Sequence, residues 1–90
     1  MTEKYLISFE STHNAIAAGE ALKDCGAIMI PTPREITASC GISVIIKAEY
    51  IKKAADVFEN VGMDIYDYTI YSVNDGQDRK YTFIKGKNYG

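Results

Sequence analysis

The sequence predicts an α+β fold in which an antiparallel sheet carries two helices on one face. Three observations lead to this prediction: several segments with strand-like alternation, two segments with helical spacing, and a short connection between the second and third strands. The order is strand, helix, strand, strand, helix, strand, with one extra strand at the C-terminus. This order is typical of the ferredoxin-like βαββαβ sandwich. A flavodoxin-like parallel sheet would need a full helical crossover within residues 31–41, which are too few for one.

The first strand is predicted at residues 4–9, where β-branched and aromatic residues precede a polar break. Ser11 or Thr12 is expected to cap the helix that follows, because both side chains can accept a hydrogen bond from a free backbone N–H. Apolar residues then recur at spacings of three and four along one helical face, and the last of them is Cys25. Gly26 follows at a position where helices commonly end in a left-handed residue.

The remaining elements follow from apolar runs and turn signals. Residues 27–30 predict a short buried strand, and residues 42–47 predict the third strand. A second helix is expected at about residues 49–61, with an apolar stripe toward the core and a charged face toward solvent. Residues 65–73 alternate in polarity as a fourth strand does, and an Asn-Asp-Gly turn leads to a last strand at residues 79–85.

Length and composition indicate one domain over residues 1–90, with a core at about residues 4–73 and a hairpin strand and tail at residues 74–90. Apolar residues make up 47% of the chain and charged residues 24%, as in ordinary globular domains. The formal charge of −2 provides no general attraction for nucleic acid or anionic lipid. No apolar run approaches the ~20 residues of a membrane helix, and the N-terminus lacks the pattern of a secretory leader. We therefore expect a cytoplasmic protein that does not enter a membrane.

Cysteine and histidine content narrows the possible chemistry. The two cysteines, Cys25 and Cys40, indicate free thiols rather than a disulfide framework, since no export signal is present. His13 is the single histidine, so the usual zinc-binding spacings are absent. Phosphate-binding glycine loops and the serine-hydrolase elbow are absent as well. We therefore expect no enzyme, no metal and no cofactor.

The connection between the second and third strands is the most informative segment. Thr32 and Glu35 have the spacing of a capping box, and Pro33 stands at the first helical position. These residues predict a short helix that ends at Gly41, with Cys40 as its last residue. Long connections on a rigid sheet are frequent places for functional residues.

The predicted topology places Cys40 beside the start of the first helix, at residues 11–13. Cys25 ends that helix about 20 Å away, so the two thiols should not meet. The helix start, together with His13 and Arg34, favours a thiolate at Cys40, whereas the end of its own short helix opposes one. Arg34 also has the alternative of pairing with a neighbouring acid.

The segment IPTPREITASCGI at residues 30–42, with YLISFE at residues 5–10, resembles the small bacterial Se/S carrier protein-like family. The similarity covers residues 5–71. The recurring feature of that family, Pro-Arg-Glu leading to Ser-Cys-Gly, is matched by Pro33, Arg34, Glu35, Ser39, Cys40 and Gly41. The resemblance implies that Cys40 carries sulfur or selenium, as a persulfide or selenopersulfide, from a cysteine desulfurase-type donor to an acceptor protein.

Two other functions are compatible with the residues themselves. A non-catalytic regulatory or protein-interaction module of ferredoxin-like fold would be expected to form a homodimer through its last strand. Nucleic-acid binding is suggested by residues 79–90, which hold four basic and no acidic residues among aromatics. The rest of the chain has six basic against twelve acidic residues, a charge of −6. The basic residues also suit the protection of an edge strand, so nucleic acid is not expected as a partner.

Overall fold

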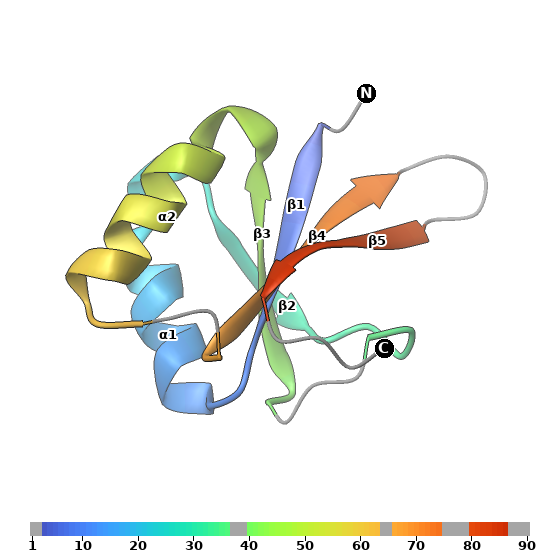
Figure 1. The fold of residues 1–90 in the computed structure, drawn as a ribbon, viewed down its shortest axis with the longest axis horizontal. Coiled ribbons are helices and arrows are strands. Elements are labelled where there is room, and N and C mark those ends of the chain that lie inside the picture. The colour runs from blue at the N-terminus through green and yellow to red at the C-terminus, as the bar shows by residue number, and fades with distance from the viewer. Residues whose placement is uncertain (1–2, 37–39, 64–65, 75–79, 87–90) are drawn as a thin grey trace.

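The structure is a computed structural model that describes residues 3–36, 40–63, 66–74 and 80–86 (Figure 1). Its strands are β1 (Lys4–Phe9), β2 (Ile28–Pro31), β3 (Ile42–Lys47), β4 (Tyr68–Asn74) and β5 (Lys80–Gly86). Its helices are α1 (Thr12–Ala21) and α2 (Ile51–Asn60), and short 3₁₀ turns span Lys23–Cys25 and Ala48–Tyr50.

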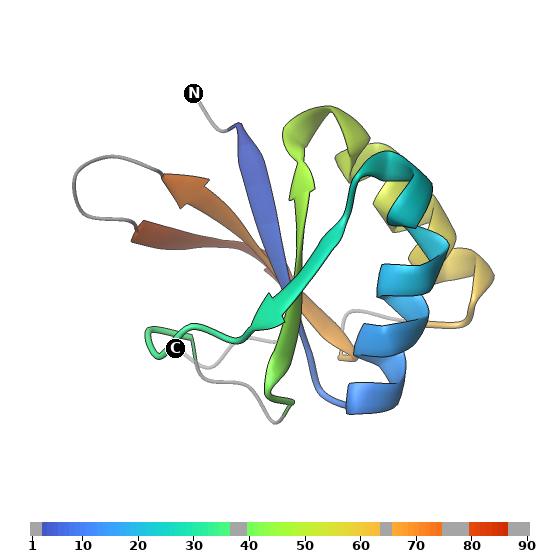
Figure 2. The ribbon, with the colours of Figure 1, turned by 180° about the vertical axis from the view of Figure 1, so that it is seen from behind.

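The strands form one sheet in the order β2-β3-β1-β4-β5, with every neighbouring pair antiparallel. β1 lies at the centre, where Leu6 is aligned with Ile45 of β3 and Tyr71 of β4. Both helices cover the same face of this sheet (Figures 1 and 2). The predicted α+β class is therefore confirmed, with an antiparallel sheet, two helices and an additional C-terminal strand.

Helix α1 begins as the sequence predicts. Ser11 has extended backbone angles, and its Oγ accepts a hydrogen bond from the Asn14 N–H at 3.1 Å. Ser11 is therefore the capping residue, and Thr12 is the first residue of the helix. Gly26 ends the following 3₁₀ turn with φ of 74°, a left-handed conformation that glycine adopts without steric cost.

Gly19 explains how α1 approaches the edge of the sheet. A glycine in a helix interior costs about 1 kcal/mol relative to alanine. A Cβ atom at this position would lie 2.8 Å from both Cγ and Sδ of Met29 in β2. The missing side chain therefore makes room for Met29 against the helix, and packing offsets the lower helix propensity.

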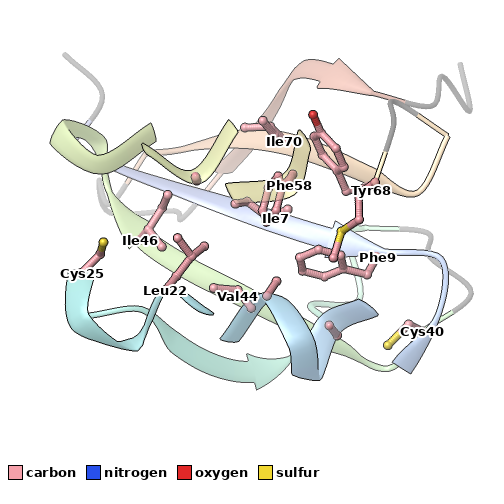
Figure 3. Close-up of a cluster of buried hydrophobic side chains, with 14 residues drawn as sticks. Ile7, Phe9, Leu22, Cys25, Cys40, Val44, Ile46, Phe58, Tyr68 and Ile70 are labelled. Atoms are coloured by element: carbon pink, nitrogen blue, oxygen red, sulfur yellow. The ribbon is translucent and has the colours of Figure 1, made fainter. Parts of the chain in front are cut away.

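The main core lies between the helices and the sheet (Figure 3). Phe58 of α2 is fully buried at its centre, with its ring centroid 5.9 Å from that of Phe9 and 4.7 Å from that of Tyr68. Aromatic pairs at these separations stabilise a core beyond the area they bury. Its buried members from β1, β3, β4 and the helices include Ile7, Phe9, Ala15, Ala18, Leu22, Val44, Ile46, Ala54, Phe58, Tyr68 and Ile70.

A smaller apolar cluster of Leu6, Ile36 and Val73 is packed against Tyr71 among other residues. Burial raises the pKa of the Tyr71 phenol above its usual value; a hydrogen bond with the Ser8 side chain opposes the rise, and the Glu10 carboxylate adds to it. Tyr71 therefore remains protonated at neutral pH, with its ring against that of Phe83 at a centroid distance of 6.3 Å.

Two local predictions are wrong. The strand expected to be buried at residues 27–30 is β2, whose Ile28 and Met29 are exposed because β2 is an edge strand. The short helix expected after Thr32 is a turn over the described residues 32–36, closed by an Ile36 N–H to Pro33 carbonyl bond at 3.1 Å. The Thr32 hydroxyl is held by partners in the adjoining segment, and so it does not cap a helix.

Candidate functional site

Cys40 lies immediately before β3, beside the first turn of α1. Its thiol donates a hydrogen bond to Thr12 Oγ1 at 3.5 Å, and its Sγ also lies 3.5 Å from the Ile42 carbonyl oxygen. The Ile42 N–H in turn donates to Cys40 Sγ at 3.3 Å. The predicted proximity of Cys40 to the start of the first helix is therefore confirmed at Thr12.

Thr32 holds the backbone of Cys40 in place. Its hydroxyl donates to the Cys40 carbonyl oxygen at 3.1 Å and shares a 2.7 Å hydrogen bond with the Ser43 hydroxyl. Its backbone N–H donates to the Gly41 carbonyl oxygen at 2.9 Å. The sequence pattern did not reveal this role of Thr32 and Ser43, because the capping-box spacing assigned Thr32 to a helix start.

The thiol of Cys40 is buried, although it lies in the connection between two strands. Both Cys40 and Cys25 are 3% exposed, and both belong to the main core cluster. They are free thiols at opposite ends of that cluster (Figure 3). The two cysteines therefore differ in their hydrogen-bonding surroundings rather than in exposure.

His13 and Arg34, the predicted supports for a thiolate, both have exposed side chains. Among the described residues, the hydrogen bonds of Cys40 Sγ involve Thr12 and Ile42 and neither of these two side chains. The other motif positions are the half-buried Pro33, the exposed Glu35 and Gly41, and Ser39, which lies outside the described residues.

Acid and imidazole groups do not gather around the thiol. In the described part of the chain, no three His, Cys, Asp or Glu side chains lie close enough together to hold a metal ion. Among the residues that the structure describes, the polar contacts of Cys40 Sγ are one hydroxyl, one backbone N–H and one carbonyl oxygen. These described contacts can hold a thiol or a thiolate, and none of them comes from a side chain that could act as a general base.

The different surroundings of the two thiols lead to a stability prediction. Replacing Cys25 with serine is expected to destabilise the fold by about 1–3 kcal/mol, because the hydroxyl would be buried without a partner. Within the described residues, Cys25 Sγ has no hydrogen bond that a serine hydroxyl could inherit. Cys40→Ser is expected to cost about 1 kcal/mol or less, since Thr12 and Ile42 remain as partners.

Urea denaturation of the two variants and the wild type measures this difference as a shift of the transition midpoint. Equal losses of stability in Cys25→Ser and Cys40→Ser would contradict the prediction, because they would show that the polar partners of Cys40 do not accommodate a hydroxyl.

Comparison with known proteins gives one family match. A family model described as "Putative Se/S carrier protein-like" matches residues 4–69, from the start of β1 into β4, and this range contains Cys40 and its whole motif. No curated protein and no solved structure matches the chain. None of the described helices has the length and apolar character needed to cross a membrane.

Proposed function

This chain belongs to the Se/S carrier protein-like family, and from that premise we propose that it carries sulfur or selenium on Cys40 as a persulfide or selenopersulfide. The observation that carries the proposal is the 3.3 Å hydrogen bond from the Ile42 N–H to Cys40 Sγ. A backbone N–H aimed at sulfur stabilises negative charge there, and the thiolate is the form of cysteine that attacks sulfur.

Two further groups beside Cys40 support an anionic sulfur. The Thr12 hydroxyl, 3.5 Å from Sγ, accepts from the thiol and can rotate to donate to a thiolate. Thr12 is also the first residue of α1, where the free N–H groups of a helix carry partial positive charge.

The transfer step needs no oxidant or reductant besides the donor. The Cys40 thiolate attacks the terminal sulfur of a persulfide on the donor's cysteine, and a bond forms between Cys40 Sγ and that sulfur. The sulfur–sulfur bond of the donor breaks, and its electron pair leaves with the donor's cysteine as a thiolate. Attack on a donor selenopersulfide gives Cys40–S–Se⁻ in the same way.

Delivery to Cys40 requires the sulfur atoms of two proteins to meet, although Cys40 is 3% exposed. We therefore propose that Cys40 becomes exposed when the donor binds, because contact with the donor displaces the side chains that cover the thiol. We propose that the exposed Arg34 guides this approach by its positive charge. The partners are a cysteine desulfurase-type donor and an acceptor protein.

The proposal also covers the fold and the cellular location. We assign β1 to β4 and the two helices to the ferredoxin-like βαββαβ arrangement. The strand order β2-β3-β1-β4 supports this assignment, since β1 and β2 both run antiparallel to β3. β5 extends this unit at the β4 edge. A cytoplasmic location, where thiols stay reduced, stays a prediction.

The direct test is loading of the purified protein. The chain is incubated with a cysteine desulfurase and cysteine, or with a selenocysteine lyase and selenocysteine, and weighed intact by mass spectrometry. We expect a gain of one sulfur or selenium atom that a thiol reductant removes. Absence of any gain with either type of donor enzyme would overturn the carrier function in favour of a protein-interaction module.

A change at Thr12 tests the proposed surroundings of the thiolate. Thr12→Val keeps the shape of the side chain but removes its hydroxyl, and we expect the initial rate of loading to fall about three- to tenfold. Thr12→Ser restores a hydroxyl and should load at nearly the wild-type rate. Equal rates for the valine and serine variants would show that this hydrogen bond does not assist the transfer.

A further inference from the structure

The two edges of the sheet differ in how they are protected against pairing with another strand. β5 carries Lys80 and Lys85, and its pairing with β4 is interrupted by a register shift between Ile70 and Tyr71. Charged residues, irregular register, proline and a short length all protect an edge strand from further pairing. β2 spans four residues and ends in Pro31, but its sequence Ile-Met-Ile-Pro carries no charge and its register with β3 is regular.

The backbone groups that β2 turns outward can be derived from its pairing. The Thr32 N–H donates to Gly41 across the end of the β2–β3 ladder, so the backbone of Thr32 is turned toward β3. In an antiparallel pair this orientation alternates along the strand. Ile30 and Ile28 therefore also turn their N–H and carbonyl groups toward β3, whereas Met29 and Pro31 turn theirs outward. Because proline has no N–H, Met29 is the one residue of β2 with both a donor and an acceptor on the free edge.

Apolar side chains surround this edge. Ile28 is 61% exposed, Met29 47% and Ile16 of α1 45%. A groove of about 500 Å³ runs along the edge, and its lining is uncharged throughout: Ile16, Met29, Ile30, Pro31, Gly41 and Ile42.

Two charged residues beyond Ile16 compensate each other. Glu20 lies four residues after Ile16 on α1, and Lys23 lies three residues after Glu20, in the 3₁₀ turn that follows the helix. The Lys23 Nζ lies 3.9 Å from the Glu20 carboxylate. A partner that fits the groove must be apolar, and it must offer a backbone donor and acceptor to Met29.

A second copy of the same edge meets each of these requirements. We propose that the protein forms a symmetric dimer in which β2 pairs antiparallel with β2 of a second copy, on a two-fold axis at Met29. The two Met29 residues exchange both backbone hydrogen bonds, and the two five-stranded sheets become continuous. Ile28 of each copy then stands opposite Ile30 of the other, as cross-strand pairs of apolar residues do in stable sheets.

This surface is not the one that the sequence indicated. The last strand was the expected dimer edge, but β5 carries charged residues and a register shift, whereas β2 carries no charge and pairs with β3 in regular register. The contacts at β2 do not involve the sulfur of Cys40. The groove at this edge includes Gly41 and Ile42, next to Cys40, but the pairing of β2 needs no carrier chemistry, so the mass measurement below tests the dimer separately from the loading of Cys40.

The test compares two lysine substitutions at the two edges. Ile28→Lys and Ile84→Lys each place a charge at an exposed position, since Ile28 is 61% and Ile84 52% exposed, and both lie outside the two buried clusters. Molar mass is measured by sedimentation equilibrium over a concentration series. We expect a wild-type dimer, an increase of at least about tenfold in the dimer dissociation constant for Ile28→Lys, and no change for Ile84→Lys.

Amide hydrogen exchange adds a measurement of the backbone contact itself. The Met29 N–H is expected to exchange at least about tenfold more slowly in concentrated wild-type protein than in dilute protein or in Ile28→Lys. A monomeric wild type at several hundred micromolar would overturn the proposal. A dimer that dissociates with Ile84→Lys instead would move the interface to β5, and mass growth beyond a dimer would show that both edges pair.

Discussion

Cys40→Ser is expected to abolish loading with sulfur or selenium while leaving the fold intact. Transfer needs a nucleophile that forms a bond to the sulfane sulfur, and a serine hydroxyl is almost entirely protonated at neutral pH. The hydroxyl is also smaller than a thiol, but it can use the same Thr12 and Ile42 partners. We therefore expect no mass gain in the donor-enzyme experiment and a melting temperature close to that of the wild type.

Cys25→Ser is the matched control for this experiment. Cys25 is as buried as Cys40 but lies at the opposite end of the core, so it should not receive sulfur (Figure 3). At temperatures below its melting temperature, Cys25→Ser is expected to accept sulfur or selenium at the wild-type level, despite its lower stability. Loading of Cys40→Ser, or loss of loading in Cys25→Ser under folding conditions, would assign the reactive thiol to Cys25.

Phe58→Ala is expected to have the largest effect on stability. Phe58 is fully buried between the rings of Phe9 and Tyr68, and truncation of a buried phenylalanine typically costs about 3–5 kcal/mol. A chain of 90 residues has a total stability of about 5–13 kcal/mol. The variant should therefore lose a large share of its stability and unfold at a much lower urea concentration.

Phe83→Ala provides the control for the loss of an aromatic ring. Phe83 is 46% exposed on β5, and its ring contact is with Tyr71 at 6.3 Å. Removing it should cost about 1 kcal/mol, the value of one aromatic pair and a partly exposed side chain. If the two variants lost similar stability in urea denaturation, the core centred on Phe58 would not be the main source of stability.

Local patterns predicted the elements of this fold well. The spacing of apolar residues predicted the buried face of the first helical segment, and Ala15, Ala18 and Leu22 of that segment are buried. Ser11 was one of two expected caps, and it is the one used. These features depend on residues within a few positions of each other, which is why they can be read from the chain.

Predictions about the candidate site were less complete. Topology correctly placed Cys40 beside Thr12, because that inference needed only the order and direction of the strands. The role of Thr32 depends on its hydrogen bonds to Cys40 and Ser43, across the ends of β2 and β3. The capping-box pattern, which spans four residues, instead predicted that Thr32 caps a helix. The pattern takes no account of the Ser43 hydroxyl, eleven residues away, which forms a hydrogen bond with Thr32.

The sequence by itself determined the α+β class, the positions of the helices and strands, the family and the cysteine on which the motif centres. Tertiary structure alone decided that Cys40 is buried and that β2 is an exposed edge. The physical reason is the range of the interactions involved. Hydrophobic periodicity and capping act between near neighbours in the chain, whereas the burial of a side chain depends on which distant segments pack over it.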